Sequence, residues 1–185
     1  MALTEDDVLD AACAIVDEFG LADLTMSPLG DARGVRAGAV YHHVPNKQPL
    51  LARVADRVVA GVPEPAGEWR PALSAWASGL RAALLAHRDS ADLVATARAM
   101  GLGRRDALAH PRRLLATAGL SESDAGAVAA ALFHFVLGHV AEEQARLDWE
   151  RFGRPDPAGL PTATAATFEV GVELLLEGIA VRFAR

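Results

Sequence analysis

Apolar residues recur every three or four positions through most of the chain, which is the spacing of one buried face on an α-helix. The first such run covers residues 5–19; it follows Thr4, a suitable N-terminal cap, and stops at Gly20. Its predicted buried stripe is Val8, Ala12, Ile15, Val16 and Phe19. Apolar and polar residues never alternate over a strand-length run, so the pattern predicts an all-α protein.

The same helical spacing returns after the first run and predicts a series of further helices. They are expected at residues 46–61, from about residue 69 onward, and at residues 92–100, 111–118, 121–149 and 163–184. The Pro/Gly-rich stretch 61–67 cannot continue a helix. We therefore predict two domains, residues 1–61 and residues 68–185, with residues 46–61 as a linking helix.

The last two predicted helices are apolar on more than one side. The apolar positions are Val128, Leu132, Phe135, Val136 and Val140 in the first, and Val170, Val172, Leu174, Leu175, Leu176, Ile179 and Val181 in the second. A helix with so broad an apolar surface needs two packing partners. A second copy of the chain is the favoured outer partner, and a larger monomeric core is the alternative.

Residues 24–47 are expected to form two short helices joined by a turn. Thr25 is a plausible cap for the first helix, and Gly34 supplies the freedom that the chain needs just past its end. Two helices joined in this way form a helix-turn-helix, which places its second helix in the major groove of DNA. This segment predicts a DNA-binding function.

Four features of the segment, in this order and spacing, resemble the DNA-binding domain of the tetracycline-repressor (TetR) family: Thr25, Gly34-Val35, Tyr41-His42-His43 and Asn46-Lys47. The resemblance implies DNA contacts by Thr25, Arg36, Ala37, Tyr41, His42, His43 and Lys47. Arg36 can bind the O6 and N7 atoms of guanine, and Ala37 can offer a methyl group to thymine. Tyr41 and Lys47 are expected to hold phosphates.

Charge qualifies this prediction without reversing it. The net charge of −6 and the pI of about 5.5 are unusual for a nucleic-acid binder. Residues 1–23 carry seven acidic groups and no basic one, whereas residues 24–53 carry Arg33, Arg36, Lys47 and Arg53 against Asp31 alone. We expect salt-sensitive, specific binding.

The resemblance continues through the C-terminal part, notably in His87-Arg88-Asp89 and in residues 134–144. It implies a ligand-binding domain that forms a homodimer through a four-helix bundle. In the tetracycline repressors this domain binds magnesium–tetracycline through a His and a Glu, and the corresponding residues here are Val94 and Glu142. Valine cannot ligate a metal, so we expect neither a metal nor a cofactor.

An apolar pocket can exist without that metal. Its candidate residues are Trp76, Leu80, Val94, Arg98, Met100, Leu114, His134 and Phe135, with simple core packing as the alternative for the apolar ones. His139 and Glu142 share the i, i+3 spacing of some metal sites in helical bundles. Because there is no second matching pair, a hydrogen bond at an interface is favoured over a metal.

These observations predict a ligand-responsive transcriptional regulator, a repressor that a small-molecule effector releases from its double-stranded DNA operator. The alternative is a dimeric small-molecule-binding protein with a degenerate DNA-binding head, because Ser27, Pro28 and Asp31 stand where relatives often carry basic residues. An enzyme is disfavoured, since the histidines and glutamates of residues 134–143 provide no nucleophile with its base. The acidic N-terminus, the absence of an apolar run of about 20 residues and the single Cys13 predict a cytoplasmic protein with no membrane partner.

Overall fold

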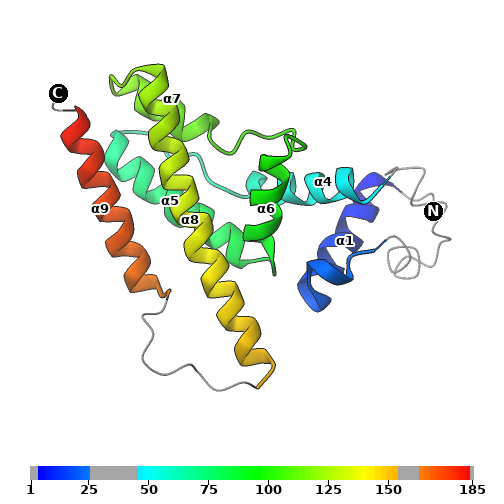
Figure 1. The fold of residues 1–185 in the computed structure, drawn as a ribbon. Helices are drawn as coiled ribbons and strands as arrows, with labels where there is room; N and C mark the ends of the chain where they lie inside the picture. Colours follow the sequence, from blue (N-terminus) through cyan, green and yellow to red (C-terminus); the bar gives the residue numbers. More distant parts are fainter. Residues whose placement is uncertain (1–3, 26–45, 154–162, 184–185) are drawn as a thin grey trace. The chain divides into compact units, whose positions relative to one another are not determined.

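The computed structural model describes residues 4–25, 46–153 and 163–183, and these are helical with no strand among them. The helices are α1 (Glu5–Phe19), a short 3-10 helix η1 (Leu21–Asp23), α4 (Lys47–Ala60), α5 (Trp69–Leu85), α6 (Ser90–Ala99), α7 (Ala109–Thr117), α8 (Glu122–Arg151) and α9 (Ala165–Phe183) (Figure 1). The all-α prediction is therefore confirmed for the described chain. The predicted helices within residues 24–45 lie outside the described residues.

Contacts divide the chain into two units. The first comprises Met1–Gly61 and Leu84–Arg105, and the second comprises Val62–Ala83 and Asp106–Arg185. The predicted break after residue 61 coincides with one boundary of these units. The sequence pattern did not indicate that residues 84–105, which include α6, group with the N-terminal helices.

The first helix shows how closely local sequence determines its ends. Thr4 Oγ1 accepts a hydrogen bond from Asp7 N (3.2 Å), and Asp7 Oδ2 accepts one from Thr4 N (2.9 Å), which forms a capping box. Gly20 ends the helix with φ of 94°, a value that favours glycine. The predicted stripe is buried except at Phe19, which is 54% exposed because it occupies the last position before this turn.

Helix ends differ from the predictions by one or two residues for identifiable reasons. α6 begins at Ser90 because the chain turns at Asp89, which has φ of 54°, and Ser90 Oγ donates to Leu84 O (2.5 Å). α7 begins at Ala109, so that Pro111 falls in its first turn, where a missing N–H costs nothing. α5 buries its predicted face of Leu73, Trp76, Leu80 and Leu84, which confirms that part of the pattern.

The second unit is organised around α8, which packs against α7 and α9. α8 alone among the described helices is long and apolar enough to cross a membrane, with a mean hydropathy of 1.4 over its best window. From the sequence we expected no apolar run long enough to span a membrane, and that prediction was too strict for α8. A helix in the core of a folded unit has the same length and composition, and α8 buries nine side chains and packs against α7 and α9.

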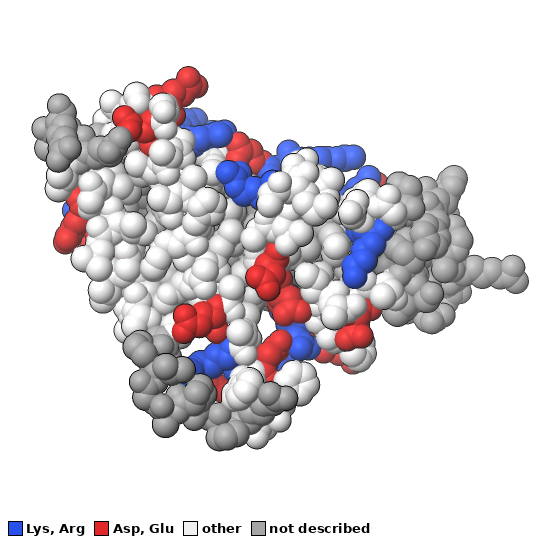
Figure 2. All heavy atoms as spheres, viewed as in Figure 1, with Lys and Arg blue, Asp and Glu red and all other residues white. Residues whose placement is uncertain are grey.

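A row of large apolar side chains on α9 is not covered by any part of the chain that the structure describes. Val170, Leu174 and Val181 are 60–64% exposed, whereas Val172, Leu176 and Ile179 on the same helix are buried. Figure 2 shows a broad surface without charged side chains over α8 and α9. An uncovered apolar surface of this kind is typical of a protein–protein interface.

Candidate functional site

The predicted DNA-contacting residues fall mostly in the part of the chain that is not described. Arg36, Ala37, Tyr41, His42 and His43 lie outside the described residues. Thr25 is exposed, and Lys47 is the first residue of α4, where it is partly exposed. Asn46 Oδ1 accepts a hydrogen bond from Gln48 N (3.0 Å), so the predicted cap fixes the helix end that carries Lys47.

Acidic residues of α1 pair with basic residues of α4. Arg53 forms an ion pair with Glu5, and Arg57 Nη1 contacts Asp10 Oδ1 (2.5 Å). These pairs hold α1 against α4, and the guanidinium of Arg53 is occupied by its contact with Glu5. The positive charge of Arg53 is therefore not available to a phosphate backbone, although the charge count along the sequence included it.

Cys13 lies within this interface. Burial raises the pKa of the Cys13 thiol, and the nearby Arg57 guanidinium opposes that rise. A thiol whose pKa is raised is a poor nucleophile, because the thiolate is the reactive form.

The turn between α5 and α6 is joined to α1 by a set of hydrogen bonds. His87 Nδ1 lies 3.1 Å from Asp17 Oδ2, and Arg88 N donates to Asp17 Oδ1 (3.2 Å). Asp89 Oδ2 accepts from Leu21 N (2.7 Å), just beyond the end of α1. The His87-Arg88-Asp89 sequence therefore forms a joint to the N-terminal helices, a role that its spacing alone did not reveal.

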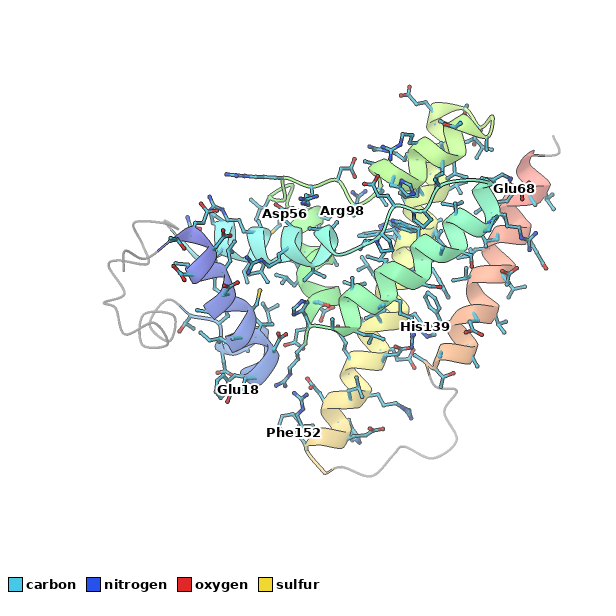
Figure 3. The ribbon with its side chains drawn as sticks, turned by 180° about the vertical axis from the view of Figure 1, so that it is seen from behind. Glu18, Asp56, Glu68, Arg98, His139 and Phe152 are labelled. Atoms are coloured by element: carbon cyan, nitrogen blue, oxygen red, sulfur yellow. The ribbon has the colours of Figure 1, made fainter. Side chains whose placement is uncertain are left out.

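A second joint connects the segment after α6 to α4. Asp56 on α4 accepts two backbone hydrogen bonds, from Arg104 N and from Arg105 N, both at 2.9 Å (Figure 3). α4 and α6 also share extensive contacts. The first unit thus ties both ends of α6 to the helices that flank the predicted DNA-reading segment.

The residues predicted for an effector pocket occupy varied environments. Trp76, Leu80 and Val94 are buried, and Leu114 and Phe135 are partly exposed, whereas Arg98, Met100 and His134 are exposed. Phe135 stacks on Phe168 of α9, with ring centroids 5.7 Å apart. Val94 offers no donor atom where a magnesium ligand is expected, so the residues present do not fit that metal.

A half-buried ion pair that the sequence did not indicate lies in the second unit. Arg81 of α5 donates to both carboxylate oxygens of Glu143 (2.8 and 2.9 Å), and its guanidinium lies 5.3 Å from the Phe168 ring centroid. His139 Nε2 lies 3.1 Å from Glu143 Oε1 and 3.1 Å from Thr164 O (Figure 3). His139 therefore bonds within its own chain, to Glu143 one turn away, and the interface bond expected for the His139 and Glu142 pair stays a prediction.

An open cleft of about 820 Å³ lies between α7 and the segment that leads into α5. Its lining includes charged side chains, Glu64 and Arg113, and apolar ones, Trp69 and Leu114. Leu114 is the residue that this cleft shares with the predicted pocket. A smaller apolar groove of about 250 Å³ runs between α8 and α9 and is lined in part by Leu132, Leu174 and Ile179.

Comparison with known proteins identifies the family. Residues 8–54 match the family model of bacterial regulatory proteins of the tetR family, and residues 62–163 match the tetracyclin repressor-like C-terminal domain. The class A tetracycline repressor protein from transposon 1721 of Escherichia coli is 33% identical over 97% of this chain and 92% of its own length.

Solved structures agree over almost the whole chain. BioQ of Mycobacterium smegmatis is 34% identical, with a TM-score of 0.86 over 97% of this chain and 98% of its own. BioQ solved with its double-stranded DNA operator is 33% identical, with a TM-score of 0.77 over 97% and 99%. A variant of TetR from Acinetobacter baumannii AYE in complex with minocycline is 28% identical, with a TM-score of 0.79 over 98% of each chain. The chain therefore belongs to the TetR family of bacterial regulatory proteins, as a DNA-binding transcriptional regulator with a tetracycline-repressor-like C-terminal domain and not an enzyme.

Proposed function

We propose that this regulator is a cytoplasmic homodimeric repressor that leaves a double-stranded DNA operator when a small-molecule effector binds its helical C-terminal domain. The structures of BioQ with its operator and of the TetR variant with minocycline support both halves of this cycle. The exposed apolar side chains of α9, together with the groove between α8 and α9, offer the surface for a second copy. In this proposal Arg36 contacts a guanine, and Lys47 contacts a phosphate.

One observation carries the proposal beyond the family assignment, namely that both ends of α6 are hydrogen-bonded to the N-terminal helices. The joints are those of Asp17 with residues 87–88 and of Asp56 with residues 104–105. A displacement of α6 by an effector is thereby passed to α1 and α4. Because an operator has two half-sites separated by about one helical turn, a change in the position of two DNA-binding heads lowers affinity.

The first test measures operator binding directly. Fluorescence anisotropy of labelled fragments of the gene's own upstream DNA is recorded with the wild-type chain, Arg36→Ala and Lys47→Ala, at two salt concentrations. We expect tight binding to one fragment. Arg36→Ala should lose about 1–3 kcal/mol at one base position, and Lys47→Ala should weaken binding evenly across sequences.

Ser121→Ala on α8 serves as a matched control, because it removes a helix cap far from residues 24–47 in the sequence. Equal, weak binding to every fragment, unchanged by either head substitution, would favour the alternative of a small-molecule-binding protein with a degenerate head.

The second test concerns the effector. Because Val94 is buried and carries no donor atom, minocycline with magnesium should not release the operator complex. The same titration with the Acinetobacter baumannii TetR protein is the positive control. Release of this chain at a comparable minocycline concentration, abolished by chelation of magnesium, would contradict the proposal.

A further inference from the structure

The cleft between α7 and the segment before α5 has the size and the walls of a small-molecule site. Its volume of about 820 Å³ falls within the range of about 300–1,000 Å³ that is typical of ligand pockets. Apolar surface is supplied by Pro65, Ala66, Trp69, Leu114 and Ala118. An apolar body of drug-like size can therefore lie along this wall.

Two guanidinium groups line the cleft: that of Arg70, which donates to Glu173 of α9 (2.8 Å), and that of Arg113. Arg113 Nη2 donates to Glu64 Oε2 (2.8 Å) and lies 3.1 Å from His110 Nδ1. The remaining N–H groups of Arg113, on Nε and Nη1, have no partner in the described chain. When a ligand carboxylate takes the place of Glu64 at Nη2, it can also accept from the neighbouring Nε or Nη1, which gives the two parallel hydrogen bonds of a bidentate pair.

His110 beside Arg113 carries an unsatisfied polar atom. The residue is 7% exposed, and its Nε2 has no hydrogen-bond partner among the described residues. His110 Nδ1 lies 3.1 Å from Arg113 Nη2 and 3.4 Å from Glu64 Oε2, so the ring belongs to the same cluster as this ion pair.

In the structure the carboxylate that binds Arg113 is that of Glu64. It belongs to the segment that leads into α5, and its side chain and that of Arg113 are 64% and 62% exposed. An exposed ion pair of this kind contributes about 0–1 kcal/mol, so another carboxylate can displace Glu64 at little cost. Glu68, just before α5, is a second acidic group on the lining (Figure 3), and Arg70 near it is already paired with Glu173. The ligand's anionic end therefore belongs at Arg113 on α7.

We propose that this cleft binds an apolar carboxylate, whose anionic group replaces Glu64 at Arg113 and whose apolar body lies against Trp69 and Leu114. Displacing Glu64 removes one of the contacts that hold the segment of residues 62–68, which is continuous with the C-terminal end of α4. This consequence for DNA binding rests on the proposed function, whereas binding in the cleft does not. The site is separate from buried Trp76 and Leu80 of the predicted core pocket.

Isothermal titration calorimetry of the full chain with decanoate, decanol and decyltrimethylammonium tests the proposal, because the three probes share one chain length and differ in head group. Decanoate should bind about tenfold more tightly than decanol and more tightly still than the cation. Arg113→Gln should remove that preference. Glu64→Gln should strengthen decanoate binding, because it removes the competing carboxylate.

Arg112→Gln is the matched control: it lies one residue away on α7, makes the same change of charge, and does not line the cleft. It should leave the decanoate preference intact, and thermal unfolding should show that all variants are folded. Decanoate binding that is absent, no tighter than that of decanol, or equally reduced by both arginine substitutions would overturn the proposal.

Operator anisotropy with and without decanoate separates this proposal from the proposed function. Failure to bind operator in the absence of decanoate would count against the proposed function alone. Decanoate binding that depends on Arg113 but leaves the operator complex intact would support the site and overturn its role in DNA release.

Discussion

At the residue scale, charge counted along the sequence differs from charge available at a surface. Arg53 belongs to the basic stretch of residues 24–53, yet it pairs with Glu5 of α1, and Arg57 one turn later pairs with Asp10. Their partners, Glu5 and Asp10, belong to the acidic residues of the stretch 1–23, so part of that negative charge is neutralised within the fold. The sequence could not reveal these pairs, because their members lie more than forty positions apart.

Cys13 leads to a prediction of pH dependence. Burial raises its thiol pKa above the ordinary value of 9.0, so the folded chain keeps this proton to higher pH than the unfolded chain does. Its contribution to stability is complete below the ordinary value and is lost as pH rises through the raised one. We expect Cys13→Ala to reduce the fall in unfolding free energy on the alkaline side and to leave the neutral value little changed.

Urea unfolding of both proteins at neutral pH and above the ordinary thiol pKa measures this effect. Iodoacetamide should also label native Cys13 at neutral pH much more slowly than it labels the urea-unfolded chain. Equal labelling rates, or parallel pH profiles for the two proteins, would show that the thiol is not held protonated by the fold.

At the element scale, the sequence predicted helices well and their partners poorly. The caps Thr4, Asn46 and Ser121 act on neighbouring backbone atoms, so local sequence was sufficient to place α1, α4 and α8. The ion pair of Arg81 and Glu143 depends on how α5 and α8 meet, which periodicity does not determine. For the same reason the pattern predicted that Leu114 lines a pocket but not that Glu64, His110 and Arg113 would accompany it.

The packing of α9 on α8 leads to a prediction at Gly171. A Cβ atom at this position would lie 2.2 Å from Cζ of Phe135, whose ring is stacked on Phe168. Because the ring has to move out of that stack, Gly171→Ala should lower the unfolding free energy by about 1–3 kcal/mol.

Gly126→Ala on α8 is the control, since a Cβ there meets nothing within 4 Å and alanine favours a helix by about 1 kcal/mol over glycine. It should be neutral or stabilising in the same urea titration. Phe135→Leu combined with Gly171→Ala should recover part of the loss. Equal effects of the two glycine substitutions would indicate that α9 does not pack on Phe135 in this way.

At the scale of the whole molecule, the acidic balance and the apolar surface of α9 favour the same assembly. A chain of net charge −6 has little general attraction for DNA, so affinity must come from a few contacts made at two half-sites together. Two half-site contacts joined in one dimer gain about 10²–10⁴ in avidity over either alone. The oligomeric state thus decides whether so acidic a chain can hold an operator.

Leu174→Glu tests that dependence, because Leu174 is 64% exposed on α9 and lines the groove between α8 and α9. A buried unpaired carboxylate in a dimer interface is costly, so light scattering after gel filtration should show the mass of a monomer. Operator affinity should fall at least about a hundredfold, while helical content stays the same. Ala116→Glu on α7 adds the same charge at an exposed position and should leave the dimer and its operator affinity intact. A dimer that persists in Leu174→Glu with unchanged operator affinity would place the interface elsewhere on the molecule.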